Sequence, residues 1–133
     1  MRQFLSALAL VVPDYDEAIA FYVGKLGFTL TEDTRLSDAK RWVRVTPPGA
    51  AQTSLLLAKA KGPEQEKAIG NQTGGRVFLF LETDDFDRDY ARYLAAGVTF
   101  DEDAPRLEEF GKVIVFSDPY GNKWDLIGRS DQC

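Results

Sequence analysis

The chain carries one sequence pattern twice, and the two copies are separated by 71 positions. The segment AKRWVRVTPPGAAQTSLLL (39–57) aligns with FGKVIVFSDPYGNKWDLIG (110–128). The segment ALALVVPDYDEAIAFYVGKLGFTL (7–30) aligns with FLFLETDDFDRDYARYLAAGVTF (78–100), with one residue dropped near the helix end. Self-similarity over most of a chain indicates repeated structural units. The fold is therefore expected to be a duplicated module.

Each copy predicts the same order of elements. It opens with alternating apolar residues, which are typical of a strand. It then turns at an acidic residue that can cap a helix, Asp14 in the first copy and Asp84 or Asp85 in the second. Apolar residues at helical spacing end at Gly27 and Gly97, which suit the left-handed cap of a helix. A strand and the aligned pair of strands follow, so each half is predicted to be β-α-β-β-β.

The predicted fold class is α+β, with a single domain over residues 1–133 that contains two tandem βαβββ modules. The first module spans 1–58, the linker 59–74 and the second module 75–129, and a short helix is expected around 64–68. Four strands with one helix leave the other face of each sheet bare. The two bare faces are therefore expected to enclose a cleft.

Charge and residue usage exclude several classes of function. A net charge of −5 and a pI of about 4.7 leave no basic face for nucleic acid, and favour solubility or a cationic or neutral ligand. No run approaches the roughly 20 apolar residues of a membrane span. Cys133 is the only cysteine in the sequence, which is typical of a reducing cytoplasm. The sequence contains no histidine, so the most common transition-metal ligand and general base is missing.

Three segments, in order and at the repeat spacing, resemble a known family. They are VVPDYDEAIAFYVGKLGF in the first half, and TDDFDRDYARYLAAGV and FSDPYGNKWDLI in the second. Over nearly its whole length the chain is similar to the vicinal oxygen chelate superfamily, which includes glyoxalase I, extradiol dioxygenases, and fosfomycin- and bleomycin-resistance proteins. The resemblance implies the paired βαβββ fold and a homodimer. It implies less about function, because one fold hosts many chemistries.

The resemblance also implies where family enzymes hold a divalent metal ion. Their histidine and glutamate ligands correspond here to Ala7, Ser54, Phe78 and Asp125. One carboxylate, one hydroxyl and two apolar side chains cannot hold a catalytic transition metal. The chain is therefore expected to use no metal and no other cofactor, and a metal-dependent glyoxalase or dioxygenase is not expected.

Strand alternation predicts a mainly aromatic and apolar cleft with a few polar anchors. The predicted ligand-binding residues are Phe78, Phe80, Ser54, Asp125, Trp42, Arg44 and Tyr120. The candidate catalytic residues are Asp125 and Glu82. Purely structural roles stay open as well, because the phenylalanines can fill the core and Arg44 can form a salt bridge. Asp125 can pair with Lys123 or Arg129, and Glu82 can cap a helix or lie in solvent.

The preferred hypothesis is a metal-independent protein that binds a small organic molecule, as bleomycin-resistance proteins sequester a drug without chemistry. One alternative is a glyoxalase-like lyase or isomerase that uses Asp125 and Glu82 to move a proton. Another is a structural or partner-binding domain whose cleft is closed by its own side chains. The sequence identifies no ligand.

Overall fold

The computed structural model describes residues 1–130, and the chain forms two compact units that are described separately: Met1–Ile69 and a second unit that begins at Gly70. The elements of the first unit are β1 (Ala7–Val12), α1 (Tyr15–Ile19), the π-helical segment η1 (Ala20–Lys25), β2 (Thr29–Arg35), β3 (Arg41–Thr46), β4 (Ser54–Lys59) and α2 (Gly62–Ala68). Those of the second unit are β5 (Val77–Glu82), α3 (Phe86–Ala95), β6 (Thr99–Phe100), β7 (Arg106–Glu108), β8 (Gly111–Ser117) and β9 (Lys123–Arg129).

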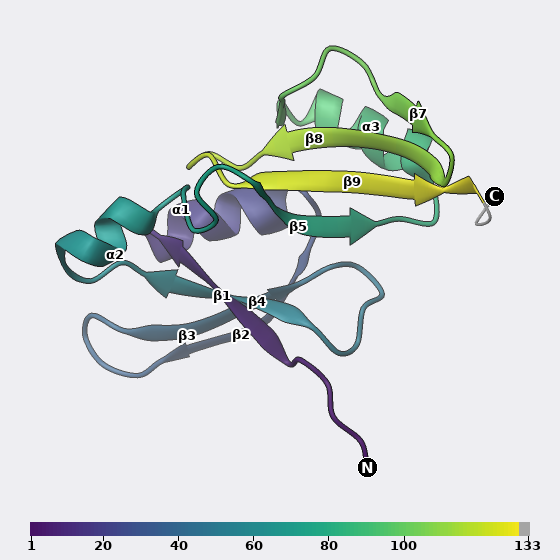
Figure 1. Cartoon of the computed structure of the whole chain (residues 1–133). Helices are drawn as coiled ribbons and strands as arrows, with labels where there is room; N and C mark the ends of the chain where they lie inside the picture. Colours follow the sequence, from purple (N-terminus) through teal and green to yellow (C-terminus); the bar gives the residue numbers. More distant parts are fainter. Residues whose placement is uncertain (131–133) are drawn as a thin grey trace. The chain divides into compact units, whose positions relative to one another are not determined.

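The first module is a four-stranded sheet in the order β1-β4-β3-β2 (Figure 1). β1 runs parallel to β4, and the other neighbours are antiparallel. The predicted β-α-β-β-β order is therefore confirmed for this half. α2 follows β4 as a separate short helix, two residues longer at its start than the predicted 64–68.

The helical part of the first module has the predicted ends. The Asp14 side chain accepts a hydrogen bond from the Glu17 amide at 2.8 Å, and Gly27 adopts a φ of +79°. The second half of the helix is π-helical, with the Leu26 amide bonded to the Phe21 carbonyl five residues before it. A π-helical turn accommodates an extra residue. It accounts for the residue that the first copy has in excess of the second.

Alternation along the strands separates the first sheet into two faces. α1 contacts β3 and β4, and the core lies between this helix and the sheet. The buried apolar residues of the first module are Leu10, Val12, Tyr15, Ala18, Phe21, Tyr22, Leu26, Phe28, Val43, Val45, Leu55 and Leu57. The side of the sheet opposite α1 is called the helix-free face.

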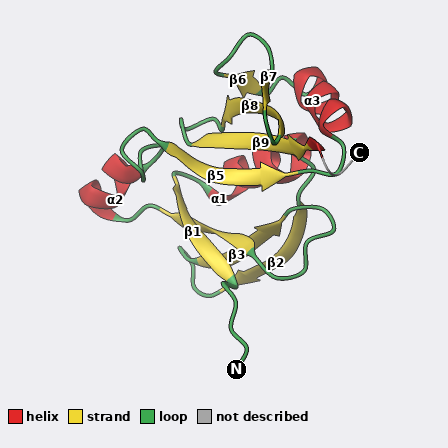
Figure 2. Cartoon of the chain, turned by 45° about the vertical axis from the view of Figure 1, so that its right-hand side comes forward, coloured by secondary structure: helices red, strands yellow, loops and turns green. Residues whose placement is uncertain are grey.

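The second module repeats this plan, but two short strands, β6 and β7, take the place of the single edge strand β2. Its sheet has the order β5-β9-β8-β6, and the short strand β7 also pairs with β8. α3 contacts β9 and lies beside the β8–β9 pair (Figure 2). Phe116 connects helix and sheet, because its ring stacks on Trp124 and meets Tyr93 of α3 edge-on. The α+β class with two sheets is confirmed, and the cleft between the modules stays a prediction.

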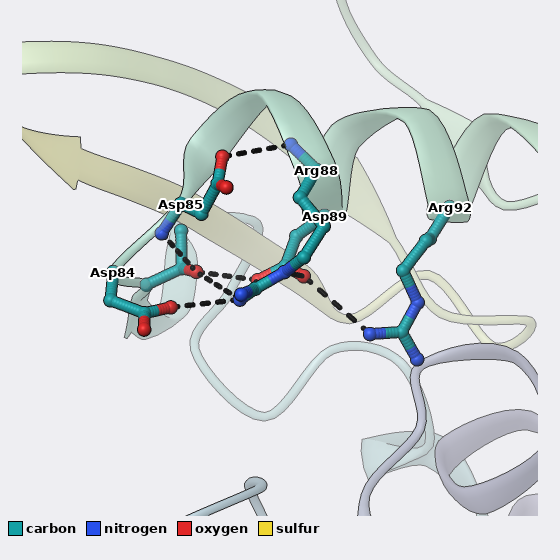
Figure 3. A network of polar contacts seen from close by, with 6 residues as sticks. Asp84, Asp85, Arg88, Asp89 and Arg92 are labelled. Carbon is teal, nitrogen blue, oxygen red and sulfur yellow. Dashed lines mark hydrogen bonds and ion pairs between the residues drawn. The ribbon is translucent and has the colours of Figure 1, made fainter.

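The start of α3 resolves the choice between two acidic caps. Asp85 accepts a hydrogen bond from the Arg88 amide at 3.1 Å and is the N-cap, whereas Asp84 forms an ion pair with the Arg88 guanidinium at 2.8 Å (Figure 3). Burial would raise the pKa of Asp89, but hydrogen bonds from Arg88 and Thr83 outweigh it and the pKa is lowered. This network fixes the first turn of α3.

Among residues 1–130, no helix has the length and apolar character to span a membrane.

Candidate functional site

The helix-free face of the first sheet brings three of the predicted site residues together. Trp42 Nε1 donates to Glu32 Oε1 at 3.0 Å, and the same oxygen lies 3.8 Å from Nη1 of Arg44. Arg44 Nε donates to Ser54 Oγ at 2.8 Å, and its Nη2 donates to the Ser6 carbonyl at 3.1 Å. A continuous polar network therefore joins β3 to its two neighbouring strands.

Strand register explains why these side chains meet. Arg44 pairs with Glu32 of β2 on one side and with Leu56 of β4 on the other. Paired residues lie on the same face of a sheet, and alternate residues point the same way. Trp42, two positions from Arg44, therefore shares its face and is 38% exposed. Arg44 is bound to Ser54 and Ser6 and lies beside Glu32, so the structure favours salt bridging over a free anion anchor.

A cavity of about 590 Å³ begins at Trp42, at the end of the first sheet where β4 leads into α2. Small-molecule sites usually have volumes of roughly 300–1,000 Å³. The aromatic and aliphatic part of its wall comes from Tyr15, Trp42, Leu56 and Ala58. The charged part comes from Lys40, Arg41, Lys59 and Lys61. This cavity combines an apolar wall with cations, and all its wall residues belong to the first unit, Met1–Ile69.

In the second module, the register differs from the equivalence that a constant offset of 71 predicts. Ala7 pairs with Ser54 in the first sheet, but Asp125 pairs with Phe80, not with Phe78. The cause is a register shift between Val77 and Leu79, which takes Phe78 out of the regular pairing with β9. Phe80 shares a face with Asp125 and is 65% exposed, so it is the more accessible aromatic ring.

Asp125 lies in an unusual environment. One carboxylate oxygen, Oδ1, is buried and has no hydrogen-bond partner among the described residues. Burial raises the pKa of Asp125, the charge of Arg106 opposes the rise, and Glu102 and Glu108 add to it. The two expected partners are engaged elsewhere, since Lys123 pairs with Asp101 and Arg129 with Glu82. Burial without a hydrogen-bond partner therefore disfavours the charged form of the Asp125 carboxylate.

The raised pKa of Asp125 predicts a pH-dependent effect of Asp125→Asn. A carboxyl group whose pKa is higher in the folded state stabilises the fold below its ordinary pKa and loses that contribution as the pH rises through the folded value. We expect Asp125→Asn to raise the melting temperature near pH 7, where the wild-type side chain is charged. The gain should shrink as the pH falls toward about 3.5, where both side chains are neutral.

Thermal unfolding followed by circular dichroism across this pH range measures the difference. Asp103→Asn is the matched control, because Asp103 is exposed on the same module. A melting-temperature difference between wild type and Asp125→Asn that stays constant with pH would contradict the conclusion that burial disfavours the charged form of Asp125.

Two further predicted residues, Glu82 and Tyr120, lie in the second unit. Glu82 lies on the face of Phe80 and is exposed, which agrees with the solvent-exposed alternative, and its carboxylate accepts from Arg129 Nε at 2.5 Å. Tyr120 lies in the tight turn between β8 and β9, where its amide donates to Asp118 Oδ1 at 2.9 Å. The Tyr120 carbonyl oxygen also lies so close to Gly70 that position 70 has no space for a side chain. Both residues belong to the second unit, whereas the network around Trp42 lies within the first.

The positions implied for a metal do not fit one. Ser54 accepts from the Arg44 guanidinium, and a cation at this distance repels a metal ion. Asp125 is influenced by the charge of Arg106 and has the aromatic Phe80 as its strand neighbour. No group of three or more His, Cys, Asp or Glu side chains within residues 1–130 is placed to hold a metal ion. These positions lack the three or four donors that a transition metal requires.

A second cavity, of about 630 Å³, lies at the start of α3 and is mainly acidic. Its charged wall residues are Asp84, Asp85, Asp87, Glu108, Lys112 and Arg129. Lys112 pairs with Asp87 at 2.9 Å, and Asp85 caps the helix. The charges of this cavity therefore serve the fold of the second module.

Sequence reasoning missed Glu32, Arg106 and the lysines around the first cavity. Glu32 was recoverable, because β2 must pair with β3 and an acid there can face Arg44. The lysines lie at the ends of strands and in turns, where alternation gives no direction. No sequence signal identified Arg106 as a cation that acts on Asp125.

Comparisons with known proteins agree with this geometry. The model of the Glyoxalase/Bleomycin resistance protein/Dioxygenase superfamily matches residues 5–126. A protein of Shewanella frigidimarina (strain NCIMB 400) is 56% identical over 133 residues, which are 99% of this chain and 98% of that protein. The crystal structure of UcmS2 has a TM-score of 0.81 and 32% identity, and covers 96% of this chain and 98% of its own.

TnmS3, an antibiotic binding protein from Streptomyces sp. CB03234, has a TM-score of 0.76 and 34% identity, with 97% of this chain and 98% of that chain covered. The family model spans most of the sequence, and the two-sheet architecture matches these structures. The resemblance predicted from the sequence motifs is therefore confirmed. The chain belongs to the Glyoxalase/Bleomycin resistance protein/Dioxygenase superfamily.

Proposed function

We propose that the protein binds a small organic molecule with an aromatic or aliphatic surface, without a metal ion and without chemical conversion. The observation that carries this proposal is the cavity of about 590 Å³ that begins at Trp42. Sequestration of a drug or metabolite follows from binding alone, and it is the biological role proposed here.

The wall of this cavity supports the proposal physically. Trp42 is 38% exposed, and an exposed indole gains free energy when a planar ligand covers it. Its Nε1 is held by Glu32 at 3.0 Å, so the ring is oriented before any ligand arrives. Leu56 and Ala58 continue the same face on β4. A ring that is already oriented loses little freedom on binding.

The similar structures support the class of ligand. TnmS3 is described as an antibiotic binding protein, and its chain and this one cover each other almost completely. Binding of an antibiotic-like organic compound is therefore the proposed class for this chain. The positions that would hold a metal do not supply its ligands, which supports binding without one.

Trp42→Ala is expected to weaken binding of a neutral aromatic probe, N-phenyl-1-naphthylamine, by about tenfold or more. This factor corresponds to about 1.4 kcal/mol, less than the roughly 1.5–3 kcal/mol gained by burying a large apolar side chain. Fluorescence titration of the probe gives the Kd, and dialysis against EDTA should leave the Kd unchanged.

Leu94→Ala is the matched control, because Leu94 is 52% exposed on α3 and lies outside the cavity. Its Kd should stay within about twofold of the wild-type value. If Trp42→Ala binds the probe as tightly as the control does, the cavity is not the binding site.

A second candidate function, a glyoxalase-like lyase or isomerase, is favoured by the buried, unpartnered Oδ1 of Asp125 and by its raised pKa. A buried carboxylate of raised pKa is a stronger base than an ordinary one, so it can accept a proton from a substrate. Turnover of the hemithioacetal of methylglyoxal and glutathione, lost in Asp125→Asn and kept in Glu82→Gln, would support this function. No turnover by the wild type, with or without added Ni, Zn, Mn or Fe, would contradict it.

The assembly and the location of the protein are also proposals. We propose that it works as a homodimer, as the family resemblance implies, and in the cytoplasm, as the cysteine usage indicates. Analytical ultracentrifugation at micromolar concentration tests the first, and a single species of monomer mass would contradict it.

A further inference from the structure

We infer that the ligand of the cavity at Trp42 is an anion: a planar or aromatic compound that carries a carboxylate, sulfonate or phosphate group. This inference rests on the proposed function, and it reverses the cationic or neutral ligand that the acidic composition favours. The ring system would lie on Trp42 and Leu56, and the anionic group would lie among Lys40, Lys59 and Lys61.

The charge around this cavity is opposite to that of the chain. The sequence has 21 acidic and 16 basic residues, yet four of those 16 line this one cavity. Among its described wall residues there is no aspartate or glutamate. Within residues 1–130, none of the three lysines forms an ion pair. Their charges are therefore available to a ligand.

Arg41, the fourth cation, is already neutralised and serves a different purpose. Its guanidinium lies 2.7 Å from Asp33 and 2.9 Å from Asp16, and it lies over the ring of Tyr15 at 5.1 Å. The hydrogen bonds that Arg41 donates to these two carboxylates raise its pKa further. Arg41 therefore ties α1 to the sheet, and the local positive charge comes from the lysines.

The backbone that carries the lysines is ordered by specific hydrogen bonds. The Lys40 amide donates to Ser37 Oγ, and the Lys40 carbonyl accepts from the amides of Leu36 and Ser37 in the turn before β3. Beside Lys59, the Ala60 amide bonds to the Val12 carbonyl at 2.8 Å. The Lys61 amide donates to Gln65 Oε1 at 2.8 Å. Hydrogen bonds therefore order the backbone at or beside each of the three lysines.

Two different parts of the wall then recognise two parts of one ligand. Three like charges around a single cavity repel one another, and an anion placed among them relieves that repulsion. Exposed ammonium groups attract an anion over about a Debye length, so this part of the affinity is sensitive to salt. The apolar contribution to the affinity is not sensitive to salt. Salt dependence therefore distinguishes the two contributions by experiment.

A matched pair of fluorescent probes separates the two parts. 8-Anilinonaphthalene-1-sulfonate and N-phenyl-1-naphthylamine share the same aromatic skeleton, and only the first carries a negative charge. In the triple variant Lys40→Gln, Lys59→Gln, Lys61→Gln, the Kd of the sulfonate should rise roughly tenfold, as expected for the loss of three nearby charges. The Kd of the neutral probe should stay within about twofold. Added NaCl should weaken the sulfonate selectively.

The control triple variant Lys25→Gln, Lys67→Gln, Arg76→Gln removes the same net charge from positions outside the cavity. It should leave both Kd values within about twofold, and near-ultraviolet circular dichroism verifies that each variant is folded. If the control loses as much sulfonate affinity as the cavity variant, or if neither loses any, the inference of an anionic ligand is wrong. If neither probe binds the wild type, or Trp42→Ala leaves both Kd values unchanged, the proposed function itself fails.

Discussion

Gly111→Ala is expected to destabilise the protein by about 3 kcal/mol or more, through the combined effects of backbone strain and steric overlap. Gly111 opens β8 with a φ of +147°, a conformation that residues with a Cβ rarely adopt. A Cβ at this position would lie 2.0 Å from the Gly128 carbonyl oxygen and 2.8 Å from Cα of Arg129. Both atoms belong to the β9 backbone, so relief requires that β8 and β9 separate.

Gly24→Ala is the opposite case and provides the matched control. Gly24 lies in the helical segment η1, and a Cβ there would meet no atom within 4 Å. Replacing a helical glycine by alanine lowers the conformational entropy of the unfolded chain. The free energy of unfolding should therefore rise by about 0.5–1 kcal/mol. Urea unfolding followed by circular dichroism measures both variants. A Gly111→Ala protein as stable as Gly24→Ala would show that β8 and β9 are not paired in this register.

The fold was predictable because the sequence contains it twice. Two aligned copies gave the order of strands and helices, the caps at Asp14 and at the pair Asp84 and Asp85, and the glycines that end both helices. Local rules suffice for these features, since a cap or a left-handed turn depends on neighbouring residues only. The extra residue of the first copy indicates an insertion near the end of its helix. The sequence alone does not distinguish an insertion in a helix from one in a loop, so it did not predict the π-helical segment η1.

The site was predictable only in part, because it depends on register and on local charge. A constant offset of 71 equates Ala7 with Phe78, but the register shift after Val77 gives Asp125 a different neighbour, Phe80. One shifted position changes which side chains lie side by side. The sequence did identify Trp42, Arg44 and Ser54 as candidate ligand-binding residues, and the structure joins them in one network.

Net charge is an average over the surface, and a binding site responds to its own neighbours. The net charge of −5 favoured a cationic or neutral ligand. The carboxylates of the first module are drawn to Arg41 and Arg44, and the lysines around the cavity are left without carboxylate partners in the part of the chain that the structure describes. An acidic protein can therefore present a cationic cavity, and only the pairing pattern reveals it.

Asp118→Ala is expected to cost about 2–4 kcal/mol, because it leaves several buried donors without an acceptor. Asp118 and Asn122 are 4% and 3% exposed in the turn between β8 and β9. Asp118 Oδ1 accepts from the amides of Tyr120 and Asn122, each at 2.9 Å, and Oδ2 accepts from Asn122 Nδ2 at 2.7 Å. The Asp-Pro-x-Gly-Asn motif within the family-like segment FSDPYGNKWDLI is thus a turn-forming device.

Two further variants separate the hydrogen bonds from the charge. Asp118→Asn should also destabilise, because its new amide donor faces the Asn122 amide donor across the 2.7 Å contact. Adding Asn122→Asp restores a donor opposite an acceptor, so the double variant should recover part of the loss. Asp103→Ala removes an exposed carboxylate from the same module and should change stability by no more than about 0.5 kcal/mol. If the double variant is less stable than the sum of its single changes predicts, the reciprocal bond between Asp118 and Asn122 does not hold the turn.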